Sequence, residues 1–222
     1  MISDRIISQS TTLIDSWQAI LQEHKAIAVI RSPELTIGLG MAEAVAAGGI
    51  KLIEVTWNSQ QPQELISQLR ARLPDCIIGA GTILNNSQLQ DAISCGAEFI
   101  FAPHFELQML KNAMNQGLPF VPGVLSPTEI VNAWQSGATA VKVFPIKTVG
   151  GAEYIKSLQG PLGQIPLIPT GGVTIDDARL MLDSGAIAVG LSSNLFLPSL
   201  VQEQNWRAIT YRTQSLIATI KI

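Results

Sequence analysis

The chain has 222 residues, of which 47% are apolar and 14% are charged, and its net charge is −3. This composition fits a folded protein with a large buried core and excludes a disordered chain. The low charge, with no basic run, argues against nucleic acid or an anionic membrane surface as a partner.

The sequence shows no pattern typical of a metal site, a disulfide framework, a secretion signal or a membrane span. With two histidines, and with Cys76 and Cys95 in no CxxC pattern, we expect no metal site and no disulfide framework. Residues 1–10 lack the apolar core of a secretion signal, and no apolar run is long enough to span a bilayer. We therefore expect a cytoplasmic protein in a reducing compartment.

The predicted elements alternate between helices and strands along the chain. A helix over about residues 10–23 comes first, and eight short apolar runs follow, separated by amphipathic stretches. The runs are Ala26–Ile30, Lys51–Thr56, Ile77–Thr82, Phe99–Pro103, Phe120–Val124, Ala140–Pro145, Pro166–Gly172 and Ile187–Ser192. The predicted helices between them include Leu35–Ala47, Pro62–Arg72, Ser87–Ser94, Pro127–Gln135 and Thr174–Ser184.

This alternation predicts an α/β protein with a parallel sheet and helical crossovers. Eight units in so short a chain favour a closed (β/α)8 TIM barrel with an extra N-terminal helix. We expect one domain over residues 1–222, in which the helix at about 10–23 lies across the bottom of a barrel at about 26–217.

A repeated phrase precedes every second strand. In each copy a glycine follows a predicted helix and leads into an apolar run, and the glycines recur every 41 to 48 residues. Glycine can end a helix in the left-handed conformation because it has no Cβ to clash. The four glycines are Gly49, Gly96, Gly137 and Gly185.

The repeat places four residues in one interior layer of the barrel. Five positions beyond the glycines lie Glu54, Phe101, Lys142 and Gly190. Because an interior layer takes its side chains from alternate strands, and strands two and six face each other, Glu54 and Lys142 should meet. Gly190 should leave a gap for a small ligand. A register shift of one residue would send Glu54 and Lys142 to opposite faces.

An amine and a carboxyl group inside apolar runs are typical of imine chemistry. Burial of an ammonium group is costly, which favours a neutral Lys142 amine that can attack a ketone. A Glu54 carboxyl group with a raised pKa can shuttle the protons that imine formation and carbon–carbon cleavage require. The alternatives are a lysine that extends to water and a purely structural ion pair.

The loops after strands seven and eight predict a phosphate site. Residues 169–173 read PTGGV and residues 190–194 read GLSSN. Glycines let the backbone approach an anion and serine hydroxyls add donors, in the loops where this fold commonly binds phosphate. Arg31, at the end of strand one, is the expected nearby cation, and the Thr82 hydroxyl is a candidate donor to a carboxylate. The alternatives are ordinary turn glycines and a surface arginine.

Six motifs, in this order, resemble the family of 2-keto-3-deoxy-6-phosphogluconate (KDPG) and 4-hydroxy-2-oxoglutarate (KHG) aldolases. They are IEVT at 53–56, GAGT at 79–82, APH at 102–104, VPGV at 121–124, KVFP at 142–145 and PTGGV at 169–173. The resemblance covers about residues 26–198. It implies a homotrimeric barrel, without a metal or other cofactor, that cleaves a small keto-deoxy sugar acid into pyruvate and an aldehyde.

The resemblance also implies roles for individual residues. Lys142 is the predicted Schiff-base lysine and Glu54 the predicted general acid and base. The predicted substrate contacts are Arg31, Asn58, Thr82, Pro103, Phe144, Gly171, Gly172, Ser192 and Ser193.

Two positions depart from the family pattern and bear on the substrate. Many members carry Arg where Asn58 stands and Gly where Ser192 stands, and Asn58-Ser59 is similar to the related 6-phosphogalactonate aldolases. The predicted substrate is 2-dehydro-3-deoxy-6-phosphogluconate, cleaved to pyruvate and glyceraldehyde 3-phosphate. The phosphogalactonate epimer and 4-hydroxy-2-oxoglutarate, which gives glyoxylate, are alternatives. A phosphosugar isomerase or epimerase and a non-catalytic metabolite-binding barrel are rivals that need no imine.

Overall fold

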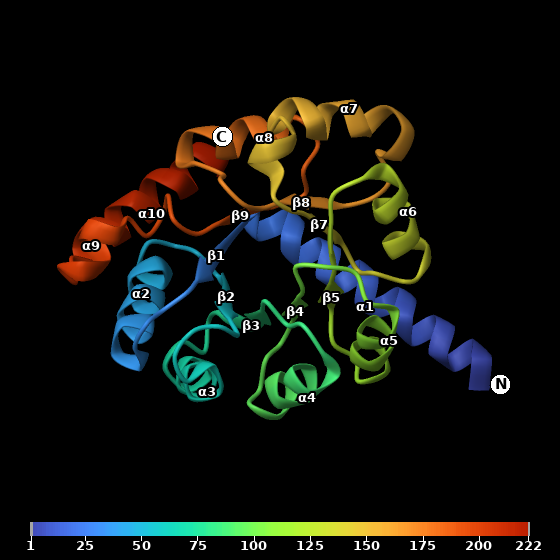
Figure 1. Cartoon of the computed structure of the whole chain (residues 1–222), viewed down its shortest axis with the longest axis horizontal. Coiled ribbons are helices and arrows are strands. Elements are labelled where there is room, and N and C mark those ends of the chain that lie inside the picture. The colour runs from blue at the N-terminus through green and yellow to red at the C-terminus, as the bar shows by residue number, and fades with distance from the viewer. Residues whose placement is uncertain (1, 222) are drawn as a thin grey trace.

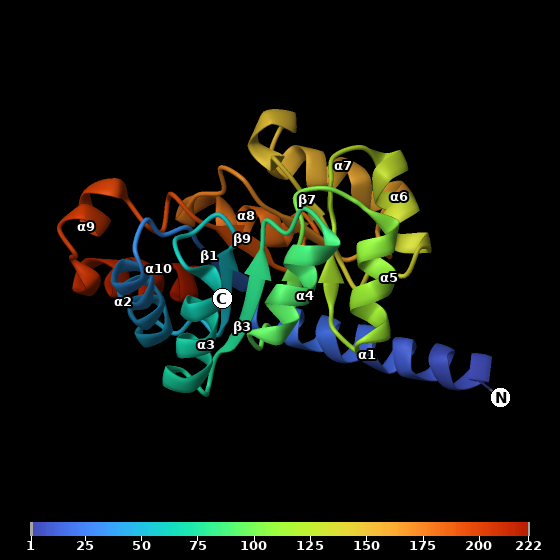
Figure 2. The ribbon, with the colours of Figure 1, turned by 60° about the horizontal axis from the view of Figure 1, so that its bottom comes forward.

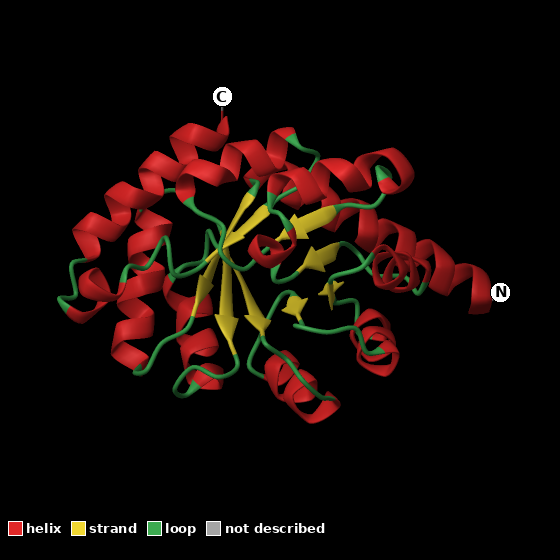
Figure 3. Cartoon of the chain, turned by 45° about the horizontal axis from the view of Figure 1, so that its top comes forward, coloured by secondary structure: helices red, strands yellow, loops and turns green. Residues whose placement is uncertain are grey.

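The strands of this computed structural model form a ring in which every pair is parallel (Figures 1 and 3). The structure describes residues 2–221, and the side chains of residues 13–221. The strands are β1 Ala26–Ile30, β2 Leu52–Thr56, β3 Ile77–Gly81, β4 Ile100–Phe101, β5 Phe120–Val121, β6 Gly123–Val124, β7 Val141–Val143, β8 Leu167–Pro169 and β9 Val189–Leu191. They pair in the orders β5-β4-β3-β2-β1-β9 and β6-β7-β8.

Two joints close this ring. Strands β5 and β6 are one run of chain interrupted at Pro122, which has no N–H for the ladder but accepts a 2.9 Å hydrogen bond from the Lys142 backbone. Strands β8 and β9 meet through the Thr170–Gly190 bridge and a 3.0 Å hydrogen bond from Ile187 N to Leu167 O. The predicted (β/α)8 barrel is therefore confirmed, with the fifth predicted strand divided in two.

Helices surround the ring, and a first helix crosses beneath it. The crossover helices are α2 Leu35–Ala47, α3 Pro62–Arg72, α4 Asn86–Ser94, α5 Leu107–Asn115, α6 Pro127–Gln135, α7 Ala152–Leu162, α8 Ile175–Asp183 and α10 Trp206–Lys221. Short helices η1 Ile146–Val149 and α9 Pro198–Gln202 follow β7 and β9. Helix α1, Ile2–His24, is longer than the predicted 10–23. It lies at the end of the barrel where the strands begin, opposite to the arrowheads (Figure 2). No helix among the described residues is long and apolar enough to cross a bilayer.

The glycines of the repeated phrase adopt the predicted conformation. Their φ angles are +103°, +91°, +100° and +103° at Gly49, Gly96, Gly137 and Gly185. The start of α6 also agrees with the sequence prediction, because Ser126 caps this helix in a capping box with Glu129. These local signals fix where each helix gives way to a strand, and so the register of the strand that follows.

The barrel interior is apolar near the amino ends of the strands and polar near their carboxyl ends. Trp17 and Leu21 of α1 pack into the inner apolar core. The other buried members of this core are Ile27, Val29, Leu52, Phe99, Phe101, Val121, Ala140, Ile168 and Ala188. Next toward the carboxyl ends of the strands come the buried polar residues Glu54, Lys142 and Thr170. The apolar filling seats this polar layer at the end of the barrel where active sites of this fold lie.

Candidate active site

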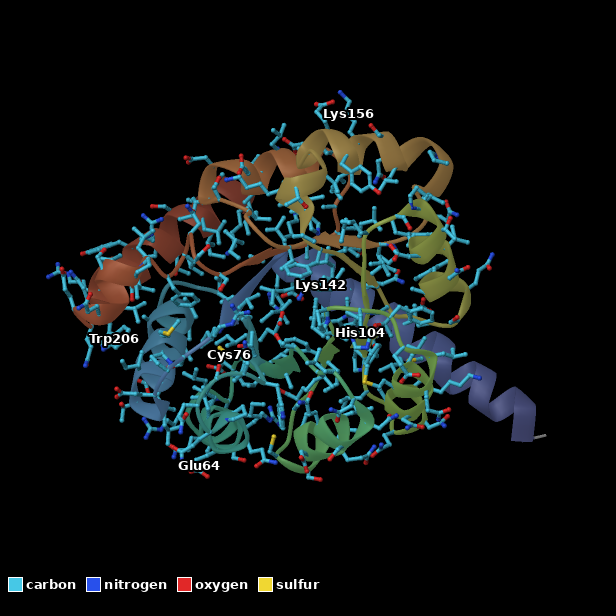
Figure 4. All side chains as sticks on the ribbon, in the orientation of Figure 1. Glu64, Cys76, His104, Lys142, Lys156 and Trp206 are labelled. Carbon is cyan, nitrogen blue, oxygen red and sulfur yellow. The ribbon has the colours of Figure 1, made fainter. Side chains whose placement is uncertain are left out.

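Lys142 and Glu54 meet inside the barrel, as the repeat predicts. Lys142 lies in the middle of β7 and Glu54 in the middle of β2, and their side chains are 6% and 1% exposed. Nζ of Lys142 is 3.9 Å from Oε1 of Glu54. Figure 4 shows Lys142 at the centre of the ring, whereas Lys156 and Glu64 lie at the rim. A buried amine and a buried carboxyl group therefore share one water-poor site.

The carboxyl group of Glu54 is held in an environment that disfavours its charge. Burial raises its pKa, and the positive charges of Lys142 and Arg31 partly offset this rise. Among the described residues, Oε1 of Glu54 has no hydrogen-bond partner. Gly81 on the neighbouring strand makes room for the carboxyl group, because a Cβ at Gly81 would overlap it. Such a group can both accept and donate a proton.

Two aromatic rings flank the amine. Nζ of Lys142 lies over the ring of Phe101, 5.6 Å from its centroid, and over the ring of Phe144, 5.2 Å from its centroid. Phe101 is buried, and Phe144 is 37% exposed at the mouth of the barrel. Of these two, sequence reasoning named only Phe144 as a substrate contact. The signal for Phe101 was its place in the repeat, where it aligns with Lys142.

Arg31 and Asn58 are brought together at the carboxyl ends of β1 and β2. Nε of Arg31 donates a 3.3 Å hydrogen bond to Oδ1 of Asn58, and both side chains are exposed. The charge of Arg31 also acts on Glu54. A cation held at this rim is suited to an anionic group of a ligand.

Thr82 and Pro103 follow β3 and β4 at the same end of the barrel and are half-buried. Thr82 has a φ of +58°, which is unusual for a β-branched residue. Such strain is often retained at functional positions. With this φ, Thr82 does not continue the extended backbone of β3.

The loops after β8 and β9 line a small pocket. The pocket has a volume of about 190 Å³ and is lined by Lys147, Gly172, Val173, Thr174, Ser193, Asn194 and Leu197. Gly171 and Gly172 have φ angles of +91° and +83°, and a Cβ at Gly172 would lie 2.7 Å from Lys147. Sequence reasoning missed Lys147 as the cation of this pocket. Its position just after β7, the strand beside β8, was the available signal.

Ser192 and Ser193 line a second pocket, which they share with Arg31. A larger pocket of about 640 Å³ contains both serines and Arg31 but extends outward between α2 and α9. Arg31 thus lines this larger pocket, and it is Lys147 that lines the small pocket beneath the glycine loop. Ser193 borders both.

The expected gap at Gly190 is wrong. A Cβ at Gly190 would lie 2.5 Å from Oγ1 of Thr170, so the side chain of Thr170 already fills the space. Gly190 is required for the close approach of β8 and β9. The sequence repeat aligns only the even-numbered predicted strands. It therefore gave no information about Thr170, which lies in an odd-numbered one.

The acidic and thiol groups do not gather in a metal-like cluster. In the part of the chain that the structure describes, no group of three His, Cys, Asp or Glu side chains is positioned to hold a metal ion.

Known proteins share both the sequence and the fold of this chain. A family model described as KDPG and KHG aldolase matches residues 17–212. A 2-dehydro-3-deoxy-phosphogluconate aldolase of Haemophilus influenzae is 34% identical over 201 residues, which make up 90% of this chain and 95% of that protein.

Solved structures agree. The KDPG aldolase of Legionella pneumophila, with pyruvate captured as a covalent carbinolamine intermediate, is 30% identical with a TM-score of 0.83, over 90% of this chain and 97% of that one. A structure described as native KDPGal is 27% identical with a TM-score of 0.80, over 88% of this chain and 94% of that one. The chain belongs to the KDPG and KHG aldolase family.

Proposed function

We propose that this protein is a class I aldolase that cleaves 2-dehydro-3-deoxy-6-phosphogluconate into pyruvate and glyceraldehyde 3-phosphate. The observation that carries the proposal is the buried contact between Lys142 and Glu54 at 3.9 Å. An ammonium and a carboxylate in this position would be a costly way to stabilise a barrel, because apolar side chains of similar volume often serve as well. A reaction that needs both groups explains their retention.

In the proposed mechanism, Lys142 forms the covalent intermediate and Glu54 moves the protons. Nζ of Lys142 attacks the C2 ketone, and loss of water gives a protonated imine. Glu54 then takes the proton from the C4 hydroxyl, and the C3–C4 bond breaks to give an enamine and the aldehyde. Protonation of the enamine at C3 by Glu54 and hydrolysis of the imine release pyruvate.

The remaining predicted contacts divide between the two ends of the substrate. We assign Thr82 and Pro103 to the pyruvate end, and Phe144 to the reacting carbons beside Nζ. Gly171 and Gly172, in the loop after β8, and Ser193, in the loop after β9, are assigned to the phosphate. The pocket of about 190 Å³ supports this assignment, since it is lined by Gly172, Ser193 and the cation of Lys147. Ser192 and Arg31 are assigned to the adjoining rim.

The substrate alternatives centre on Asn58. Many family members carry an arginine where Asn58 stands. In this chain the side-chain oxygen of Asn58 accepts a hydrogen bond from Arg31, so Arg31 supplies the positive charge at this rim. The phosphogalactonate epimer is the second candidate, and 4-hydroxy-2-oxoglutarate is the third. Comparison of kcat/KM on the three substrates decides among them, and the phosphorylated gluconate should give the highest value.

The cytoplasmic location, the homotrimer and the single domain over residues 1–222 remain predictions. The trimer has a direct measurement: light scattering of the purified chain should give three times the 23.8 kDa mass of one copy. A monomeric mass would contradict it.

The function is tested by turnover of the phosphorylated substrate. Lys142→Ala should lower kcat/KM by a factor on the order of 10³ or more, because the covalent route is lost. Lys156→Ala, an exposed lysine on α7, is the matched control and should keep full activity. Full cleavage activity of Lys142→Ala would contradict the imine mechanism.

A further inference from the structure

Three aromatic rings form a column from the bottom of the barrel to the amine of Lys142. Trp17 of α1 packs on Phe99 with 5.1 Å between ring centroids, and Phe99 packs edge-on against Phe101 at 5.6 Å. The three side chains are at most 2% exposed. Gly79 makes room for the column, because a Cβ there would overlap the ring of Phe99. The column holds the ring of Phe101 in one position under Lys142.

The ring of Phe101 faces the Lys142 nitrogen, which has few other partners among the described residues. Nζ of Lys142 lies over Phe101 at 5.6 Å from the centroid, and over Phe144 at 5.2 Å. The nearest carboxylate oxygen, on Glu54, is 3.9 Å away, which is longer than a hydrogen bond. The face of an aromatic ring is negative and attracts a cation, most strongly where water is excluded.

From this geometry we propose that Phe101 is an electrostatic partner of the Lys142 nitrogen and, together with Phe144, stabilises the iminium cation formed with the keto acid. The proposal rests on the proposed aldolase function. It assigns to Phe101 a role beyond filling the barrel, since a leucine would fill the layer without a negative face.

The chemistry shows at which step this stabilisation acts. The lone pair of Nζ forms the bond to C2, and the ketone oxygen leaves as water after taking one proton from the nitrogen and one from the Glu54 carboxyl group. The product is a cationic iminium. When C3–C4 breaks, its electron pair moves to C3, the C=N pair moves to nitrogen, and the positive charge disappears. Because imine formation begins with the neutral amine and ends with a cation, a ring that favours the cation raises the population of imine without speeding bond cleavage.

The experiment measures imine population at equilibrium in the full-length protein. The protein is incubated with increasing pyruvate and reduced with borohydride, and the fraction carrying the adduct is read by intact mass. Phe101 is replaced by phenylalanine analogues with one, two and three ring fluorines, which keep the ring shape but weaken its negative face. The same series at Phe99, which belongs to the column but does not face the nitrogen, is the matched control.

We expect the pyruvate concentration for half-maximal trapping to rise with each fluorine at position 101, by about tenfold at three fluorines. The kcat for cleavage should not fall, because the cation that the ring stabilises is lost in that step. Phe101→Leu should show a similar rise in half-maximal pyruvate, and thermal unfolding checks that each variant is folded. The series at position 99 should leave half-maximal trapping unchanged.

An unchanged midpoint across the series at position 101, or an equal rise in the series at position 99, would overturn the role of Phe101. In either case an adduct on the unmodified protein would leave the aldolase function intact. Absence of any adduct on the unmodified protein at saturating pyruvate would instead overturn both proposals.

Discussion

At the scale of single residues, the site depends on opposing influences on one carboxyl group. Burial raises the pKa of Glu54, while the cations of Lys142 and Arg31 act in the other direction. Lys142 is buried beside it, whereas Arg31 is exposed, so solvent screens its charge. The proposed base is therefore adjusted by a rim residue that takes no part in the covalent chemistry.

Removal of the Arg31 charge should move the pH profile. Without this cation the carboxylate of Glu54 is less favoured, so its pKa rises and the base is ionised only at higher pH. The acidic limb of kcat/KM against pH should shift upward in Arg31→Gln, and the shift should be smaller at high salt.

Arg70→Gln is the control for this profile, because Arg70 pairs with Glu98 at an exposed position on α3. It should leave the limb in place. A downward shift in Arg31→Gln would show that Arg31 does not favour the ionised form of Glu54.

At the scale of elements, closure of the barrel depends on a tight contact between β8 and β9. The backbone bridge joins Thr170 to Gly190, and the Thr170 side chain occupies the space where a Cβ at Gly190 would lie. This pairing connects the loop that carries Gly171 and Gly172 to the loop that carries Ser193. The proposed phosphate pocket is thus positioned by the strand contact behind it.

A double-mutant cycle tests this contact. Gly190→Ala should lower the free energy of unfolding by about 1–3 kcal/mol, because the new methyl group meets Oγ1 of Thr170. Thr170→Ala in the same chain removes that atom and should recover part of the loss. Urea unfolding measures both. Strictly additive losses in the double variant would contradict a direct clash.

The sequence predicted elements best where local signals are strong. Helices α2, α3 and α6 begin and end at their predicted residues, and β1 matches its apolar run. Strands β4 to β6 are only two residues long, much shorter than their runs, because Pro122 and the barrel curvature limit ladder pairing. Helix α1 begins earlier than predicted, since its first turns have little apolar periodicity.

At the scale of the whole molecule, the N-terminal helix completes the core from below. Trp17 is 2% exposed and packs on Phe99, so a residue far from the mouth supports the apolar layer beneath Lys142. The periodicity of the barrel strands carries no information about which side chain closes the bottom. For this reason the sequence placed the helix correctly but did not identify Trp17.

Loss of this closure should be costly. Trp17→Ala should lower the free energy of unfolding by about 3–5 kcal/mol through the cavity that it leaves. Trp134→Ala, a half-buried tryptophan on α6, is the comparison and should cost less. Guanidinium unfolding of both variants gives the two values, and equal losses would contradict a special role for Trp17 in the core.

The site itself was predictable to the extent that it lies on the repeat. The register brought Glu54 and Lys142 together because their spacing from a helix-ending glycine is set by backbone geometry. Lys147 was not found in this way, because it follows the strand in a short 3₁₀ helix whose direction the repeat does not define. Contacts between odd and even strands, such as Thr170 with Gly190, needed the coordinates.

The most direct test of a reactive amine at the centre of the barrel is to locate the covalent adduct. The protein is reduced with borohydride in the presence of pyruvate and digested, and the modified residue is identified by tandem mass spectrometry. The adduct should be found on Lys142 and should be lost in Lys142→Arg. An adduct on Lys147, Lys51 or any other lysine, or no adduct at all, would contradict the proposed chemistry.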